Sequence, residues 1–128
     1  MESWQSYWEQ GGSYYRTACG GYKRPEKFNP DALFNLVAMS IEKMSMAMLL
    51  KVSAMPEGHT FLDLAKSLDK VAPLPNDLKD NLIRLDDFQA GFCSLVSEPA
   101  RTIALDDIPP MLQVCNRLQS YIRDYVDG

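Results

Sequence analysis

Hydrophobic residues recur at every third or fourth position along most of this chain, with polar residues between them. That spacing is typical of α-helices, and no segment alternates as a half-buried strand would. Prolines and paired glycines separate the periodic segments, because neither favours a helix interior. We therefore expect an all-α fold, an up-and-down bundle of about five helices with short connections. The expected helices cover about residues 4–19, 30–55, 61–68, 77–96 and 109–125.

The segment that follows Asn29 carries the strongest helical pattern. Asn29 can cap a helix, Pro30 suits its first turn, and no helix breaker appears before Pro56. Beside one continuous apolar stripe, this helix carries hydrophobic residues around most of its circumference. Such a helix either lies at the centre of a bundle or buries its second face in a partner. We expect Met39 and Met46, one heptad apart, to form a dimer seam or a partner groove; the alternative is that both are core residues.

Glycines and short polar side chains predict where several helices begin and end. Gly11-Gly12 lowers the helix propensity of the first segment by roughly 2 kcal/mol relative to alanine, so close packing against another segment must hold this helix. Gly20-Gly21 should end it. Thr60 should cap the third helix, and Asn76 or Asp77 should cap the fourth.

Composition narrows the class of protein. A length of 128 residues, 46% hydrophobic and 23% charged, suits one soluble domain without a membrane span, with an ordered core over about 4–126. The net charge of −4 argues against binding to duplex nucleic acid. Three widely spaced cysteines and the lack of a signal peptide indicate a reducing, cytoplasmic location. A single histidine and the lack of phosphate-loop or metal-ligand spacing predict no metal and no cofactor.

Two short stretches carry a family pattern. Residues 38–43 have the form Ala-x-x-x-Glu-Lys, and residues 56–64 hold a Pro and Gly turn, a histidine and a pair of leucines. In this arrangement the chain resembles the HEPN superfamily (higher-eukaryote and prokaryote nucleotide-binding domains) over about residues 5–126. The resemblance implies a bundle of four or five helices that is often dimeric and often works with a small nucleotidyltransferase partner.

Some members of that family are metal-independent ribonucleases, which use an arginine followed four to six residues later by a histidine. This chain departs from that pattern, because no arginine lies at residues 53–55, ahead of His59, and no histidine follows Arg117 or Arg123. The chain therefore lacks the arginine–histidine pair that this ribonuclease mechanism requires. We expect a non-catalytic binding or interaction module; the alternative outside this class is a structural dimer that binds no small ligand.

Glu42, Lys43 and His59 are the candidate ligand-binding residues. Charged side chains are seldom buried without a partner, yet Glu42 and Lys43 interrupt an apolar helix. One interpretation places all three residues at a nucleotide pocket between the second and third helices. A second gives Glu42 a purely structural bond to His59 that joins these helices. In a third, His59 and Glu42 form the acid–base pair of an enzyme acting on nucleotides or RNA.

A basic segment lies between the first two helices. Lys23, Arg24 and Lys27 follow Arg16, and this stretch contains one carboxylate, Glu26, against four cations. Tyrosines are interleaved with these cations, and such a combination can hold a phosphate and stack a base. We expect Lys23, Arg24 and Lys27 to contact a phosphate; the alternative is an ordinary solvated loop.

Overall fold

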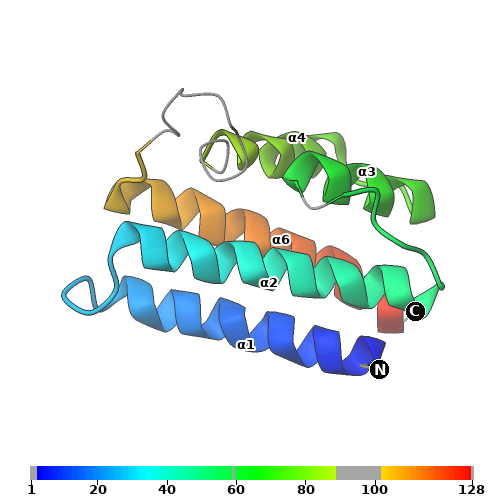
Figure 1. Ribbon diagram of the computed structural model, residues 1–128, viewed down its shortest axis with the longest axis horizontal. Coiled ribbons are helices and arrows are strands. Elements are labelled where there is room, and N and C mark those ends of the chain that lie inside the picture. The colour runs from blue at the N-terminus through cyan, green and yellow to red at the C-terminus, as the bar shows by residue number, and fades with distance from the viewer. Residues whose placement is uncertain (1–2, 59, 89–101, 128) are drawn as a thin grey trace.

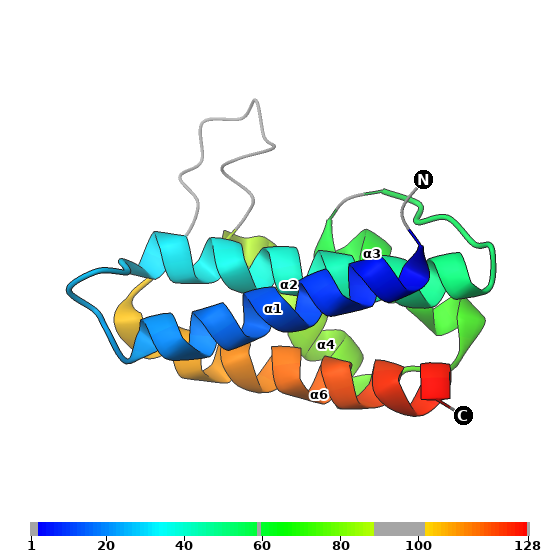
Figure 2. The ribbon, with the colours of Figure 1, turned by 90° about the horizontal axis from the view of Figure 1, so that it is seen from below.

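The computed structural model describes residues 3–58, 60–88 and 102–127, and within these ranges the chain is helical with no strand. The all-α prediction is confirmed (Figure 1). Three long helices, α1, α2 and α6, run side by side, and two short ones, α3 and α4, cover the side of α2 and α6 away from α1 (Figures 1 and 2). The helices are α1 (Trp4–Tyr22), α2 (Pro30–Lys51), α3 (Phe61–Val71), α4 (Asn76–Arg84), the 3₁₀ turn η1 (Leu105–Asp107) and α6 (Ile108–Asp127).

The predicted N-terminal caps are formed for two helices and not for a third. The Ala32 N–H donates to Asn29 Oδ1 at 2.8 Å, and the Asp63 N–H donates to Thr60 Oγ1 at 3.0 Å. For α4 the prediction is wrong, because Pro75 occupies the cap position without a side-chain bond and Asn76 is already helical. The backbone of Pro75 is extended, with φ of −54° and ψ of 136°, so the helix begins at the next residue.

Three helix ends differ from the predictions. Helix α1 continues through Gly20-Gly21 to Tyr22, and the Lys23 N–H closes it by donating to the Gly20 carbonyl oxygen at 3.2 Å. Helix α2 ends at Lys51 rather than near residue 55. Ser53 takes a φ of 59°, so that the Ala54 N–H reaches back to the Leu49 carbonyl oxygen at 2.8 Å, which is the left-handed ending usually made by glycine.

The third altered end is that of α4, which ends at Arg84; the single non-helical residue Leu85 separates it from further helical residues at 86–88. The Leu85 N–H donates to the Leu82 carbonyl oxygen at 3.1 Å, a tighter turn than an α-helix makes. Residues 89–96 of the predicted helix lie outside the described residues.

Helix α2 forms the centre of the core. Its inner face is fully buried, and the aromatic ring of Phe34 packs against Phe61 of α3 and against Phe88, with centroids 6.3 and 5.8 Å apart. Facing residues from α3, α4 and α6 complete one continuous hydrophobic cluster. The main members are Leu33, Val37, Ile41, Met44, Met48, Leu64, Leu68, Leu78, Leu82, Met111, Leu118 and Ile122.

Helix α2 is also long and apolar enough to cross a membrane by length and composition alone. A stretch of 18 residues within this helix has a mean hydropathy of 1.4, and 56% of that stretch is buried inside the fold. The core helix of a soluble protein passes the same test. Here the helix packs against α1, α3 and α6, so its apolar character is largely accounted for by the core.

Gly11, the first glycine of the pair in α1, lies at a close contact with α2. The Ser40 hydroxyl donates to the Gly11 carbonyl oxygen at 2.7 Å, and a Cβ atom built on Gly11 would lie 2.5 Å from Met44 Cγ. Gly11 therefore lets the backbone and the Met44 side chain of α2 approach α1 more closely than a residue with a Cβ atom would allow. The expectation of a close approach at Gly11 is confirmed.

Candidate functional site

Glu42 and Lys43 lie near the middle of α2, and their side chains point in different directions. Glu42 is exposed and has no hydrogen bond or ion pair with the rest of the described chain. The Lys43 ammonium lies 5.0 Å from the ring centroid of Tyr7, a cation–π contact that turns it toward α1. His59 lies outside the described residues, so the predicted pairing of Glu42 with His59 stays a prediction.

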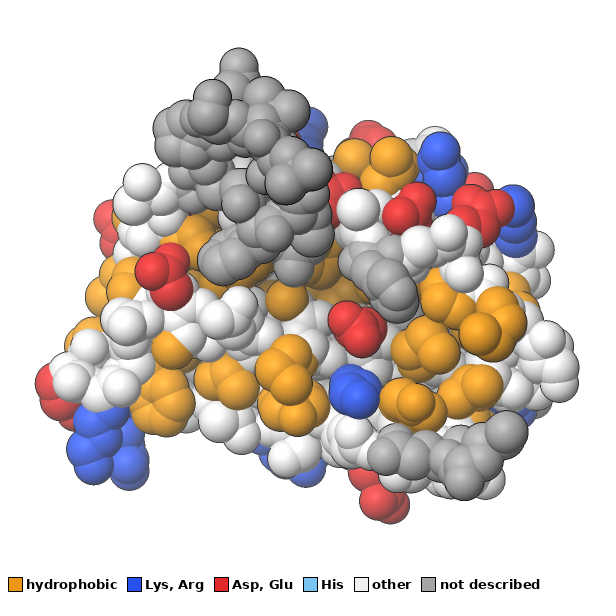
Figure 3. Space-filling model, in the orientation of Figure 1, with side chains coloured by type: hydrophobic (Ala, Val, Ile, Leu, Met, Phe, Trp, Pro, Cys, Tyr) orange, Lys and Arg blue, Asp and Glu red, His pale blue; other side chains and the backbone are white. Residues whose placement is uncertain are grey.

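The partly exposed side of α2 carries a row of four apolar residues and one lysine. Leu36, Met39, Lys43, Met46 and Leu50 follow one another at spacings of three and four residues, as in the seam of a coiled coil. We call these five residues the outer α2 row. Met39 is 40% exposed, and the other four are half-buried. Figure 3 shows hydrophobic side chains gathered along α2 on this face.

Two more exposed hydrophobic residues follow the helix directly. Val52 is 41% exposed and Met55 is 74% exposed. Together with Met39 they make up the exposed large hydrophobics in the described part of the chain, and all three belong to α2 or to the segment just after it. The surface of this region is therefore more apolar than the rest of the described surface, a feature typical of contact sites.

The basic turn between α1 and α2 borders a small cavity of about 310 Å³. Lys23 and Arg24 line it together with Phe28 and small residues of α1. The turn is held by its own backbone, since the Arg24 N–H donates to Gly21 and the Lys27 N–H donates to Arg24, both at 2.9 Å. Lys27 belongs to the same turn and does not line the cavity, and the predicted contact of Lys23, Arg24 and Lys27 with a phosphate stays a prediction.

A second cavity, of about 400 Å³, lies between α1 and α6 and shares Lys23 with the first. Its other lining residues are Tyr15, Cys19, Tyr22, Leu112, Gln113 and Asn116. Burial, followed by a hydrogen bond with Cys19, raises the pKa of Tyr15 to about 12. Tyr15 and Tyr22 lie near the cations in the sequence, whereas Gln113 and Asn116 come from α6 and carry no local sequence signal.

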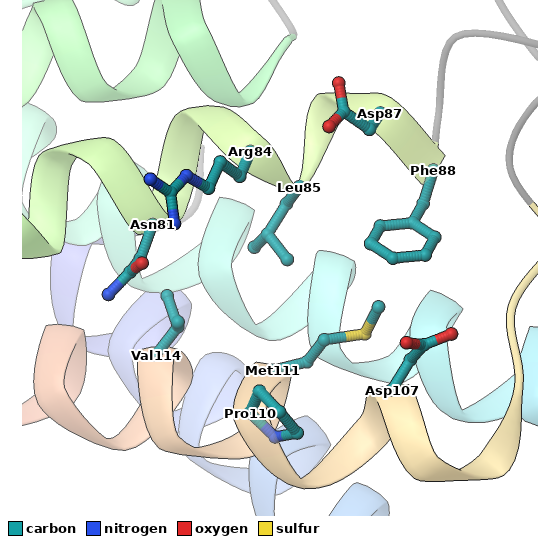
Figure 4. A pocket seen from close by; sticks show the side chains of 9 residues that line it. All are labelled: Asn81, Arg84, Leu85, Asp87, Phe88, Asp107, Pro110, Met111 and Val114. Atoms are coloured by element: carbon teal, nitrogen blue, oxygen red, sulfur yellow. The ribbon is translucent and has the colours of Figure 1, made fainter.

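A third cavity, of about 260 Å³, lies between the end of α4 and the start of α6 (Figure 4). Leu85, Phe88, Met111 and Val114 provide its apolar walls, and each is at most 8% exposed. Its remaining lining residues are Asn81, Arg84, Asp87, Asp107 and Pro110. Sequence reasoning missed this cavity because its two walls are more than twenty residues apart in the chain.

Acidic side chains in the described part of the chain do not assemble into a metal-binding cluster. Within the described ranges, no group of three or more histidine, cysteine or acidic side chains is placed to hold a metal ion. Asp77 forms an ion pair with Arg117 at 2.9 Å, and Asp86 accepts hydrogen bonds from the Phe61 and Leu62 N–H groups at the start of α3. These acidic residues therefore have structural partners.

A known protein with a similar fold was found by comparison of structures. No protein-family model matches the chain, and no curated protein matches it either. The chain is similar in structure to the crystal structure of TT1696 from Thermus thermophilus, with a TM-score of 0.76 and 17% sequence identity. The match covers 97% of this chain and 98% of that one, so the two proteins share the all-α fold.

Proposed function

We propose that this chain is a non-catalytic interaction module, of the kind that its HEPN resemblance implies, which forms a homodimer through the outer α2 row. The observation that carries the proposal is the row itself, an apolar seam at coiled-coil spacing on the solvent side of the most hydrophobic helix. Helices α1, α3 and α6 bury most of α2, and the outer α2 row is the apolar strip that they leave partly exposed. The second apolar face is explained when another surface covers it.

A second copy of the chain is the partner that the charges favour. Glu42 and Lys43 are adjacent, at the midpoint between Leu36 and Leu50. A two-fold axis passing near this midpoint places the Lys43 of each copy beside the Glu42 of the other, so the surface is complementary to itself. The resemblance alone also allows a nucleotidyltransferase-type partner. Such a partner would cover the same apolar row, and it would not need to pair its charges with Glu42 and Lys43 in this symmetric way.

The mass of the protein in solution tests the dimer. A variant with Met39→Glu and Met46→Glu should remain folded and become monomeric, with the dimer Kd raised about a hundredfold or more, because two charges must be desolvated per chain. Arg123→Glu on α6 is the control, because it changes the net charge by the same amount as the double variant at an exposed position outside the row. If the wild-type protein is still monomeric at a concentration of about 0.1 mM, its dimer Kd is weaker than that and the homodimer proposal is overturned. The nucleotidyltransferase-type partner then remains as the alternative.

A second candidate function is nucleotide binding at the end of the bundle that holds the basic turn. Lys23 borders both neighbouring cavities, so a phosphate on Lys23 and Arg24 would sit next to Tyr15, Tyr22 and two amide side chains. Cations beside tyrosines suit a phosphate attached to an aromatic base. This arrangement favours the basic turn over the segment between the second and third helices as the nucleotide site.

Thermal unfolding with a panel of mononucleotides tests this second candidate. At about 1 mM, a bound nucleotide should raise Tm, and Lys23→Gln with Arg24→Gln should remove the rise. Lys66→Gln on α3 is the control because Lys66 is exposed and lines neither cavity. A rise that survives the double substitution but is lost in Glu42→Ala would place the nucleotide between α2 and α3 instead.

A further inference from the structure

The cavity between α4 and α6 has a hydrophobic floor and charged ends. Leu85 and Phe88 wall it from the α4 side, and Met111 and Val114 wall it from α6. These side chains are buried within the fold yet border open space, so an apolar group placed there would contact them without disturbing the core. A volume of about 260 Å³ accommodates a small organic molecule and is too small for a folded partner.

One end of the cavity carries two hydrogen-bond donors. Asn81 and Arg84 are three residues apart on α4, and their polar groups lie close to each other at the same end of the cavity (Figure 4). Neither side chain makes a hydrogen bond or an ion pair within the described part of the chain. By contrast Arg117, in the same α4–α6 interface, is paired with Asp77 at 2.9 Å. Arg84 is thus an arginine whose guanidinium fork is available beside an apolar pocket.

The other end of the cavity is acidic. Asp107 lies across the apolar floor from Arg84, and its Oδ2 accepts a 2.9 Å hydrogen bond from the Ala104 N–H. Asp87 also lines the cavity, although its carboxylate points away from the floor in Figure 4. The Asp107 carboxylate at this far end is only an acceptor of hydrogen bonds, so it offers no donor to a second negatively charged group of a ligand. A phosphate dianion or a dicarboxylate is therefore a poor match.

From these features we infer that the α4–α6 cavity binds a small apolar monocarboxylate. The ligand carboxylate accepts hydrogen bonds from the Arg84 guanidinium, whose planar fork matches two carboxylate oxygens, and from the Asn81 carboxamide. The hydrocarbon part of the ligand packs on Met111 and Val114. This site is separate from the outer α2 row and from the basic turn, so it is independent of the proposed dimer and nucleotide functions.

Binding can be measured by NMR titration of the full chain with 4-methylpentanoate. Saturable shifts of the Met111 and Val114 methyl signals are expected, and Arg84→Gln should weaken binding about tenfold or more, because a charge-assisted pair is lost. Arg123→Gln is the matched control, as this arginine is exposed on α6, away from the cavity. It should leave the affinity unchanged.

Two further ligands decide whether the charge at Arg84 matters. The neutral 4-methylpentanamide has nearly the same shape and should bind about tenfold more weakly than the acid, whereas glutarate should be disfavoured by the acidic end. Absence of shifts up to about 20 mM acid, equal affinity for acid and amide, tighter binding of glutarate, or unchanged affinity in Arg84→Gln would each overturn the proposal.

Discussion

The Ser40 hydroxyl donates a 2.7 Å hydrogen bond to the Gly11 carbonyl oxygen, across the contact between α2 and α1. The same hydroxyl oxygen accepts a 3.2 Å bond from the thiol of Cys115 on α6. Ser40 and Cys115 are fully buried, so one small polar group joins the three long helices inside the core. A larger residue at position 11 would separate α1 from α2 and break this bond.

Gly11→Ala should therefore destabilise the protein, against the usual effect of helix propensity. Alanine is favoured over glycine by about 1 kcal/mol in a helix, but its Cβ here would lie 2.5 Å from Met44 Cγ and 3.0 Å from the Met44 backbone nitrogen. Overpacking of this kind costs about 1–3 kcal/mol. Urea unfolding should show a net loss of stability for this variant.

Gly20→Ala, in the same helix, should instead stabilise the protein. Its Cβ would meet nothing within 4 Å, and its φ is not positive. We expect a gain of roughly 0.5–1 kcal/mol from helix propensity and the reduced entropy of the unfolded chain. If both alanine variants change stability in the same direction, close packing at Gly11 does not control the α1–α2 contact.

Asp69 should make the connection between α3 and α4 sensitive to acid. Its carboxylate accepts hydrogen bonds from the Leu74 N–H at 2.9 Å and from the Lys79 ammonium at 3.0 Å, and these lower its pKa below the ordinary value of 3.8. A carboxylate whose pKa is lower in the folded protein adds stability that is fully present above its unfolded pKa, and that stability is lost as the pH falls through the folded pKa.

Asp69→Asn tests this link through the pH dependence of Tm. The variant should be less stable than the wild type at neutral pH, and the difference should shrink between about pH 4 and pH 2 as the wild-type carboxylate is protonated. Asp80→Asn, an exposed position on the adjacent helix, is the control. A difference that stays constant over this whole range would contradict a role for the Asp69 charge.

Most helices could be predicted from the sequence because local rules decide them. The apolar spacing of α2 and the caps at Asn29 and Thr60 involve only near neighbours in the chain. Helix ends that depend on other features could not be placed this way. Ser53 ends α2 in a left-handed conformation that a serine does not signal, and Asp86 caps α3 from beyond α4.

The candidate sites also differ in whether the sequence could predict them. Lys23 and Arg24 are adjacent in the sequence, so their shared turn was predictable. The outer α2 row could also be anticipated through Met39 and Met46, because a single helix carries it. Arg84 and Met111 meet at a cavity only because α4 packs on α6, a tertiary contact with no local signal.

Cys115 should be nearly inert toward thiol reagents in the folded protein. Burial raises the pKa of its thiol from 9.0 to about 12. Since the thiolate is the reactive form, the fraction available at about pH 8 falls roughly a thousandfold relative to an ordinary thiol. Peptide mapping after treatment with iodoacetamide should find Cys115 unmodified in buffer and modified in concentrated urea. Rapid labelling in buffer would mean that the contact between α6 and α2 opens readily.

The two charges beside the outer α2 row provide a specific test of the homodimer. Glu42→Lys alone and Lys43→Glu alone each place like charges together across the two-fold axis, and each should raise the dimer Kd about tenfold. The double variant, with both charges exchanged, restores opposite charges and should recover most of the affinity. Sedimentation equilibrium measures all three, and circular dichroism checks that the Lys43 contact with Tyr7 is not required for folding. If the double variant is as weak as the sum of the single variants, the two charges do not face each other across the dimer axis.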